Sequence, residues 1–340
     1  MIVVMSRETS KEDLEAIRER IESKGLTAQI NLGVERTVVG VMGSIPPDFK
    51  DEMELMNGVA EVVMISKPYK LASKEFHPDD TIIKVGDAII GGSNPVIMAG
   101  PCSVEDEEQM VSTARAVKAA GATVMRGGAF KPRTSPYSFR GMGEDGLKLL
   151  HMAKEETGLP IITEVMAVED VETVARYADI LQIGARNMQN YNLLDEVGKL
   201  DKPVMVKRGL SASYEEWLLA AEYVMAGGNQ DVILCERGIR GFETFTRFTL
   251  DVAAVPVIKR LSHLPIVCDP SHSTGKWYLV TPVALASIAA GAHGLIIEVH
   301  PNPDVAKCDG PQSLTFENFD MLMEQVKAIS SVRKDPVNTN

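Results

Sequence analysis

Two patterns of hydrophobic and polar positions divide the chain. Over residues 1–66, short apolar runs alternate with segments of helical spacing, such as Leu14, Ile17 and Ile21 in the segment that Ser10 caps. The predicted strands are 1–5, 27–32, 36–42 and 59–65, and the predicted helices lie between Ser10 and residue 24 and over 48–56. This order, βαββαβ, predicts a ferredoxin-like split fold.

The remainder of the chain repeats a cycle of apolar strand and amphipathic helix. After a short hairpin at 82–90, the predicted strands are 96–98, 123–125, 161–163, 180–183, 204–206, 232–234, 266–268 and 295–299. Helices are predicted between them at 107–119, 144–156, 214–226 and 282–289, the last capped by Thr281, with a closing helix at 317–329. Eight cycles in about 250 residues predict a (β/α)8 TIM barrel. An open doubly wound sheet is the alternative, but it usually has fewer parallel strands.

These patterns predict four parts. Residues 1–66 form a small ferredoxin-like domain, 67–80 a charged linker with two prolines, 81–332 the catalytic barrel, and 333–340 a disordered tail. The first domain contains no cluster of polar side chains that could perform chemistry, which favours a regulatory or binding role. A purely structural role in assembly is the alternative.

Composition limits the possible partners and the compartment. The chain carries a formal net charge of -12, which disfavours nucleic acid and an anionic membrane as partners. No apolar run reaches the roughly 18 residues of a membrane span, and the first residues lack the layout of a signal peptide. The four cysteines are far apart and form no CxxC pair, which argues against a disulfide framework. We therefore expect a cytoplasmic protein.

Basic side chains follow several of the predicted barrel strands. In a TIM barrel these strand ends form the active site. In the loop 126–135, Arg133 can bind phosphate oxygens at two points and Lys131 offers a point charge. Further basic residues follow later strands, namely Arg186, Lys207, Arg208 and Arg237. We expect a phosphorylated or polycarboxylate substrate, although an ordinary basic turn is the alternative for the loop alone.

Four other side chains at this end of the barrel offer metal ligands. Cys102, His272, Glu298 and Asp309 supply a thiolate, an imidazole and two carboxylates, which suit Mn²⁺, Fe²⁺, Zn²⁺ or a similar ion rather than Ca²⁺. No local motif such as HExxH is present. Two alternatives stay open: Cys102 and His272 are ordinary buried residues, or one position belongs to a neighbouring donor, Cys268, Cys308 or His300.

Five motifs resemble those of 3-deoxy-D-arabino-heptulosonate 7-phosphate (DAHP) synthases, over residues from about 95 to 312. They are the segments 100–103 (GPCS), 126–135 (RGGAFKPRTS), 184–187 (GARN), 269–273 (DPSHS) and 298–300 (EVH). The resemblance implies a metal-dependent condensation of phosphoenolpyruvate with erythrose 4-phosphate, the first step of the shikimate pathway. The related 3-deoxy-octulosonate 8-phosphate synthases resemble the chain less, because they usually carry Lys-Ala-Asn-Arg where it has Lys-Pro-Arg-Thr at 131–134.

The resemblance also implies roles for individual residues. One divalent ion (Mn, Fe, Zn, Co or similar) would be held by Cys102, His272, Glu298 and Asp309. Lys131 is the expected proton donor and Glu164 the residue that positions water; with His272 and Cys102 they form the expected catalytic set. The expected substrate-binding residues are Arg126, Lys131, Pro132, Arg133, Thr134, Ala185, Arg186, Lys207, Arg237, Asp269 and Ser273.

The N-terminal domain resembles the ferredoxin-like regulatory domain that some DAHP synthases carry. This implies an aromatic amino acid effector at that domain, tyrosine or phenylalanine, and we expect a homo-oligomer, with a tetramer as the assembly. Functions of a different class stay open: a barrel that only binds phosphorylated sugars, or an aldolase that forms a Schiff base on Lys207.

Overall fold

The computed structural model describes residues 1–33, 36–43, 45–46, 48–64, 68–132, 135 and 137–332. The predicted tail 333–340 and the predicted substrate ligands Arg133 and Thr134 lie outside the described residues. The chain divides into two compact units, one of Met1–Asp80 with Arg260–His263 and one of Thr81–Lys259 with Leu264–Asn340. No helix in the described part of the chain is both long enough and apolar enough to cross a membrane.

The first unit contains a four-stranded antiparallel sheet, and the predicted βαββαβ order is confirmed. Its elements are β1 (Ile2–Met5), α1 (Lys11–Ser23), β2 (Thr27–Leu32), β3 (Thr37–Met42), α2 (Phe49–Glu54) and β4 (Val59–Val63), with the sheet order β2-β3-β1-β4. Ser10 and Asp13 form a capping box at α1. The apolar residues of both helices pack with those of β1 and β3 in one buried core.

The other face of this sheet is covered by part of the predicted linker. A side chain at Gly40 in β3 would collide with the ring of Phe76, since a Cβ there would lie 2.0 Å from that ring. Phe76 is buried, and its carbonyl accepts a hydrogen bond from Asn31 Nδ2 at 3.3 Å. The glycine in β3 therefore permits an aromatic side chain to lie flat on the strand.

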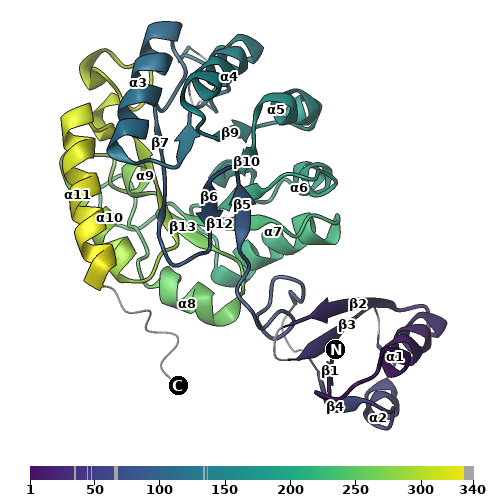
Figure 1. The fold of residues 1–340 in the computed structure, drawn as a ribbon. Coiled ribbons are helices and arrows are strands. Elements are labelled where there is room, and N and C mark those ends of the chain that lie inside the picture. The colour runs from purple at the N-terminus through teal and green to yellow at the C-terminus, as the bar shows by residue number, and fades with distance from the viewer. Residues whose placement is uncertain are drawn as a thin grey trace. The chain divides into compact units, whose positions relative to one another are not determined.

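The second unit is a closed barrel of eight parallel strands, which confirms the predicted TIM barrel (Figure 1). The strands are β7 (Val96–Gly100), β8 (Val124–Arg126), β9 (Ile161–Val165), β10 (Ile180–Ile183), β11 (Val204–Lys207), β12 (Val232–Glu236), β13 (Ile266–Cys268) and β14 (Gly294–Glu298). The hairpin β5 (Ile83–Val85) and β6 (Ala88–Ile90) buries Ile83, Val85, Ala88 and Ile90 in one cluster with residues of these strands. It therefore packs into the barrel core.

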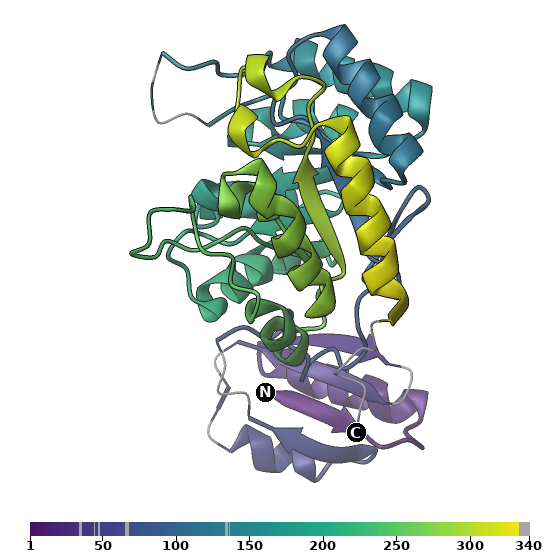
Figure 2. The same ribbon diagram turned by 90° about the vertical axis from the view of Figure 1, so that its left-hand side faces the viewer.

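Helices surround the barrel; the five predicted ones correspond to α3, α4, α7, α10 and α11, whereas α5, α6 and α8 had no predicted range. They are α3 (Glu107–Ala120), α4 (Glu144–Thr157), α5 (Val171–Tyr177), α6 (Tyr191–Gly198), α7 (Tyr214–Ala226), α8 (Ala254–Leu261), α10 (Trp277–Ala289) and α11 (Phe316–Val332). Figure 2 shows α11, in yellow, packed beside α10 on the outside of the barrel. The predicted start of α10 at Thr281 is wrong, because the helix begins at Trp277 and includes Pro282. Pro282 is the sixth residue of the helix, so α10 lacks the one hydrogen bond that an amide at this position would donate to the Tyr278 carbonyl.

Candidate active site

The four predicted metal donors come from three strand ends and one loop. Cys102 lies just after β7, Glu298 is the last residue of β14, and Asp309 lies in the loop after β14. His272 belongs to the short helix α9 (Pro270–Thr274), whose N-cap Asp269 follows β13 and accepts a hydrogen bond from the His272 amide at 2.9 Å. All four side chains therefore lie at the carboxyl ends of the barrel strands.

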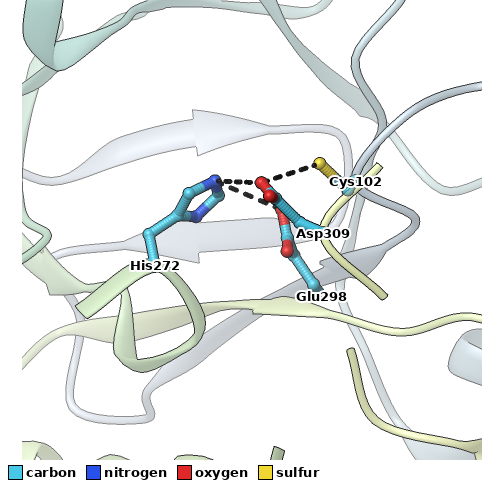
Figure 3. A group of neighbouring side chains, drawn as sticks. All are labelled: Cys102, His272, Glu298 and Asp309. Atoms are coloured by element: carbon cyan, nitrogen blue, oxygen red, sulfur yellow. Dashed lines mark hydrogen bonds and ion pairs between the residues drawn. The ribbon is translucent and has the colours of Figure 1, made fainter. Parts of the chain in front are cut away.

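The donor atoms of these four residues lie within 4.8 Å of one another (Figure 3). His272 Nε2 lies 3.3 Å from Glu298 Oε1 and 3.9 Å from Asp309 Oδ2. The Cys102 thiol lies 3.4 Å from Asp309 Oδ2. One sulfur, one nitrogen and two carboxylates around a single point are a donor set for a divalent transition-metal ion.

The charges of three donors suit a cation. Burial lowers the pKa of His272, which keeps its imidazole neutral and able to coordinate. Burial raises the pKa of Glu298, but the surrounding cationic groups, Arg126 among them, together have the opposite effect, so this pKa lies below its usual value. Burial also raises the pKa of Asp309, but the groups around it, Arg247 among them, together lower this pKa to about 2. Both carboxylates are therefore ionised at neutral pH.

The Cys102 thiol behaves differently from the other donors. Burial, followed by its hydrogen bond with Cys308 and the charge of Glu298, raises the pKa of this thiol well above 9. The Lys131 ammonium, 3.1 Å from the sulfur, acts in the opposite direction. A bound divalent ion ionises a coordinating thiol outright. The buried thiol thus fits a ligand that ionises when the metal binds.

One of the three rival donors lies beside the group. Cys308 Sγ lies 2.9 Å from Cys102 Sγ, and both are free thiols. Cys268 instead interacts with Ser287 of α10, and His300 Nε2 faces Glu105 at 3.7 Å. Cys308 is therefore the alternative ligand that the geometry keeps open.

A basic cavity of about 310 Å³ opens next to the donor group. Its lining includes predicted site residues, namely Arg126, Lys131, Pro132, Glu164, Ala185, Arg186, Lys207, Arg237, His272 and Asp309. Among the described residues, Arg126 Nε and Arg237 Nη1 are buried nitrogen atoms without a hydrogen-bond partner. Buried donors are rarely left unsatisfied, so these two atoms point to an anionic ligand.

Two predicted substrate ligands lie behind the cavity wall. Asp269 is buried, and its Oδ2 pairs with Lys207 Nζ at 2.5 Å. The same oxygen lies 2.8 Å from His272 Nδ1, although the N–H direction misses it, so that contact is electrostatic rather than a full hydrogen bond. Ser273 is also buried and donates to the Pro270 carbonyl at 3.0 Å. Asp269 thus orients two residues of the site instead of lining the cavity.

The cavity also includes residues that sequence reasoning missed. Arg247 lies in the loop before α8, and its Nη1 is 3.3 Å from Asp309 Oδ1 and 3.0 Å from Gln312 Oε1. Gln182 faces inward from β10 and donates to Glu164 Oε2 at 3.4 Å. The inward position of Gln182 in its strand was a usable signal, whereas Arg247 is far from its strand end in sequence.

Arg208, noted at the end of β11, serves the scaffold. Its Nη1 bonds Glu236 and Asp251, each at 2.9 Å, and its guanidinium lies over the ring of Tyr214 at 4.5 Å. The Tyr214 hydroxyl donates to the same Asp251 oxygen at 2.7 Å. This network joins the end of β11 to the loop that precedes α8, and Arg208 is absent from the cavity lining.

Comparison with known proteins identifies the family. The chain matches the DAHP synthetase I family over residues 71–334 and the DAHP synthase ferredoxin-like domain over residues 1–67. The chain belongs to the DAHP synthetase I family. The resemblance seen in its motifs is thereby confirmed. The enzyme class is DAHP synthase, which acts at the first step of the shikimate pathway.

Several relatives place the chain within this family. The phospho-2-dehydro-3-deoxyheptonate aldolase of Thermotoga maritima is 49% identical over 99% of this chain and 100% of its own length. The crystal structure of that DAHP synthase superposes with a TM-score of 0.78, covering 97% of each chain, and a truncated form superposes with a TM-score of 0.73 over 77% of this chain and 97% of its own. The 2-dehydro-3-deoxyphosphooctonate aldolase of Geobacter sulfurreducens is 31% identical over 74% of this chain and 98% of its own length.

The contacts of the Asp269 carboxylate with Lys207 and His272 predict that removal of its charge impairs the site. We expect Asp269→Asn to lower turnover of this DAHP synthase by about 10–100-fold, as loss of a carboxylate that orients a metal-ligating histidine typically does. The variant leaves the Lys207 ammonium buried without its partner. Turnover and metal affinity are measured on the variant. Asp170→Asn is the control, because Asp170 precedes α5 and belongs neither to the donor group nor to the cavity lining. Unchanged values in Asp269→Asn would contradict a positioning role.

Proposed function

We propose that the chain condenses phosphoenolpyruvate with erythrose 4-phosphate, giving DAHP and inorganic phosphate, with one divalent ion in the site. The observation that supports this most is the four-donor group beside a cavity with two unpartnered guanidinium nitrogens. A metal site and a polyanion site that share one mouth suit a reaction between two phosphorylated substrates.

The proposed metal ligands are Cys102, His272, Glu298 and Asp309, and the bound ion would supply Lewis-acid polarisation of the aldehyde carbonyl. Arg126 and Arg237 offer their unpartnered N–H groups to the phosphate and carboxylate of phosphoenolpyruvate. Arg186 and Lys207 line the same cavity and add positive charge. These residues orient the enol carbon toward the aldehyde.

Lys131 is the proposed proton donor to the developing alkoxide. Burial disfavours its ammonium form, but the anionic surroundings, which include the Glu298 carboxylate, raise its pKa, so the group is protonated. Its Nζ lies 2.9 Å from the Cys102 carbonyl oxygen, which holds it at the donor group. Glu164, held by Gln182, is the proposed residue that positions the water attacking the phosphate-bearing carbon.

The pairing of Lys207 argues against a Schiff-base aldolase. Such an enzyme needs a free amine as nucleophile. Lys207 Nζ lies 2.5 Å from a buried carboxylate oxygen of Asp269, and both side chains are almost fully buried. Because this contact pairs the Lys207 Nζ with a carboxylate, the lysine is better placed to bind an anion than to attack a carbonyl.

One assay tests the proposed function directly. Consumption of phosphoenolpyruvate is followed with and without erythrose 4-phosphate, and with and without a chelator. We expect consumption that needs the aldose phosphate, stops after chelation and returns when a divalent ion is added. Consumption without erythrose 4-phosphate, or full activity in chelator, would reject the proposal.

We propose that the segment 131–134 determines which aldose phosphate the enzyme prefers. We expect Arg133→Ala to raise the KM for erythrose 4-phosphate by about 10–100-fold, since each hydrogen bond to a charged group contributes about 1.5–3 kcal/mol. The KM for phosphoenolpyruvate should change little. Arg140→Ala, an exposed arginine of the same loop, is the matched control. A higher kcat/KM with arabinose 5-phosphate in the unaltered enzyme would instead favour the octulosonate class.

The remaining proposals concern regulation and assembly. Residues 1–66 would bind an aromatic effector, tyrosine or phenylalanine, with 67–80 as a linker and 81–332 as the catalytic barrel; the match over residues 1–67 supports the first of these. We also propose a homo-oligomer, with a tetramer as the assembly. A cytoplasmic location agrees with cysteines that are all free thiols.

A further inference from the structure

The loop that carries Asp309 is a compact unit. It leaves β14 after Glu298 and contains two short turns, η3 (Pro303–Val305) and η4 (Gly310–Gln312). A Cβ at Gly310 would lie 2.2 Å from the Pro303 carbonyl oxygen, so the two turns pack with their backbones in contact. The Ser313 hydroxyl donates to the Asp309 carbonyl at 3.2 Å and ties the end of the loop to its tip.

The tip of this loop presents two possible metal ligands in succession. Cys308 Sγ lies 2.9 Å from Cys102 Sγ, and Asp309 Oδ2 lies 3.4 Å from the same sulfur. Asp309 has φ 50°, and in the described part of the chain it is the one non-glycine residue with a positive φ. This backbone conformation costs energy and persists only where the surroundings fix it. The two donors are neighbours in the sequence, and both lie against the Cys102 sulfur.

Glu105 fixes the loop immediately before its tip. The Lys307 amide donates to Glu105 Oε1 at 2.8 Å, and the Ser103 hydroxyl donates to the same oxygen at 3.2 Å. The Glu105 side chain is only 9% exposed, and the Glu105 amide donates to Gln109 Oε1 at 3.2 Å. One buried carboxylate therefore connects the segment after Cys102 with the residue that precedes Cys308 and Asp309.

His300 brings the start of the loop to the same carboxylate. Its Nδ1 accepts a hydrogen bond from the Asn302 amide at 3.1 Å, so a neutral ring carries its proton on Nε2. Nε2 is buried without a hydrogen-bond partner and lies 3.7 Å from Glu105 Oε2. Both oxygens of Glu105 thus face the loop, one toward its start and one toward its tip.

We propose that Glu105 is a positioning residue that fixes the loop so that Asp309, and not Cys308, supplies the fourth metal ligand. The proposal rests on the metal site proposed above. Glu105 lies outside the four-donor group and does not line the basic cavity, so it acts through its contacts with the loop and with Ser103. Residues that hold metal ligands in place typically change metal affinity 10–100-fold when removed.

Cobalt(II) binding to the full-length protein tests this proposal. Co²⁺ bound to a thiolate absorbs in the near ultraviolet, so titration reports both affinity and the number of sulfur ligands. We expect Glu105→Ala to weaken Co²⁺ binding by about 10–100-fold and to strengthen the sulfur band as Cys308 joins Cys102. The double variant Glu105→Ala/Cys308→Ser should return the band to its single-thiolate intensity.

Two further variants control the experiment. Glu105→Gln keeps a carbonyl oxygen that can accept from the Lys307 amide, and it should restore most of the affinity. Glu108→Ala removes an exposed glutamate from the first turn of α3 and should bind Co²⁺ as the unaltered protein does. If Glu105→Ala binds Co²⁺ with unchanged affinity and an unchanged sulfur band, the proposal is wrong.

The remaining outcomes are also decisive. If the unaltered protein shows no sulfur band with Co²⁺, the metal site itself is rejected, and the positioning role with it. If Glu105→Ala does not fold, Lys307→Pro removes the same hydrogen bond from the donor side, with Lys307→Ala as its control. A Co²⁺ affinity in Lys307→Pro equal to that of Lys307→Ala would overturn the proposal.

Discussion

Cys102→Ala is expected to lose both the divalent ion and turnover. The substitution removes the sulfur from a group of four donors that lie within 4.8 Å of one another. Metal ions in such sites contribute several kcal/mol of transition-state stabilisation, so we expect turnover to fall by about 1,000-fold or more. Metal content after dialysis and the rate of phosphoenolpyruvate consumption measure the two losses.

The matched control for this prediction is Cys268→Ala. Cys268 is also a buried free thiol at a strand end, but it interacts with Ser287 of α10 and not with the donor group. We expect that variant to keep its metal and its activity. Full activity in Cys102→Ala would remove the basis of the metal assignment, whereas loss in both variants would indicate damage to the fold.

The protonation of Cys102 adds a pH dependence to metal binding. Burial, then the contacts with Cys308 and Glu298, hold the pKa of this thiol well above 9, so the thiol is protonated across the physiological range. Each ion that binds must displace that proton. At pH values below this pKa, the apparent metal affinity should therefore increase about tenfold for each unit by which the pH is raised. Cys102→Ala should lose this dependence together with the affinity.

The sequence predicted those features of the molecule that depend on chain order and strand ends. The alternation of apolar strands and helices predicts the barrel because each strand must be buried on both faces. Parallel strands place their carboxyl ends at one mouth, so residues as distant in sequence as Cys102 and His272 could be expected to meet. The same reasoning predicts Arg126 and Arg237 at this mouth, and both side chains line the cavity.

Features that depend on loop geometry could not be predicted from the sequence. Arg247 reaches Asp309 because of the path of a long loop, and no periodic pattern records that path. The positive φ of Asp309 and the bond from Lys307 to Glu105 are set by backbone packing within the loop after β14. The predicted cap at Thr281 is wrong for a related reason, because proline is typical of a helix start but α10 already begins at Trp277. A helix boundary predicted from local propensity is wrong where tertiary packing stabilises a different boundary.

A barrel that begins at Thr81 is expected to be active and insensitive to aromatic amino acids. The first unit consists of Met1–Asp80 together with the short segment Arg260–His263, and the four donors and the basic cavity belong to the second unit. A truncated form of the Thermotoga maritima relative has yielded a structure. An effector inhibits only if it binds better to a state in which the mouth of the barrel is less competent. Without residues 1–80 the effector has no binding site. Inhibition of the enzyme, which is typically about 5–150-fold for two coupled sites, should then be lost.

Initial rates with and without tyrosine or phenylalanine measure this loss, on the truncated and full-length proteins at equal concentration. Light scattering measures the molecular mass of both proteins, and it therefore shows whether the first unit has a role in assembly as distinct from effector binding. If the first unit only holds an oligomer together, the full-length enzyme is not inhibited by either amino acid, and truncation changes the molecular mass alone. If the truncated barrel is inhibited as strongly as the full-length enzyme, the effector binds to the barrel. The regulatory role of the ferredoxin-like unit is then wrong, even though its family match stands.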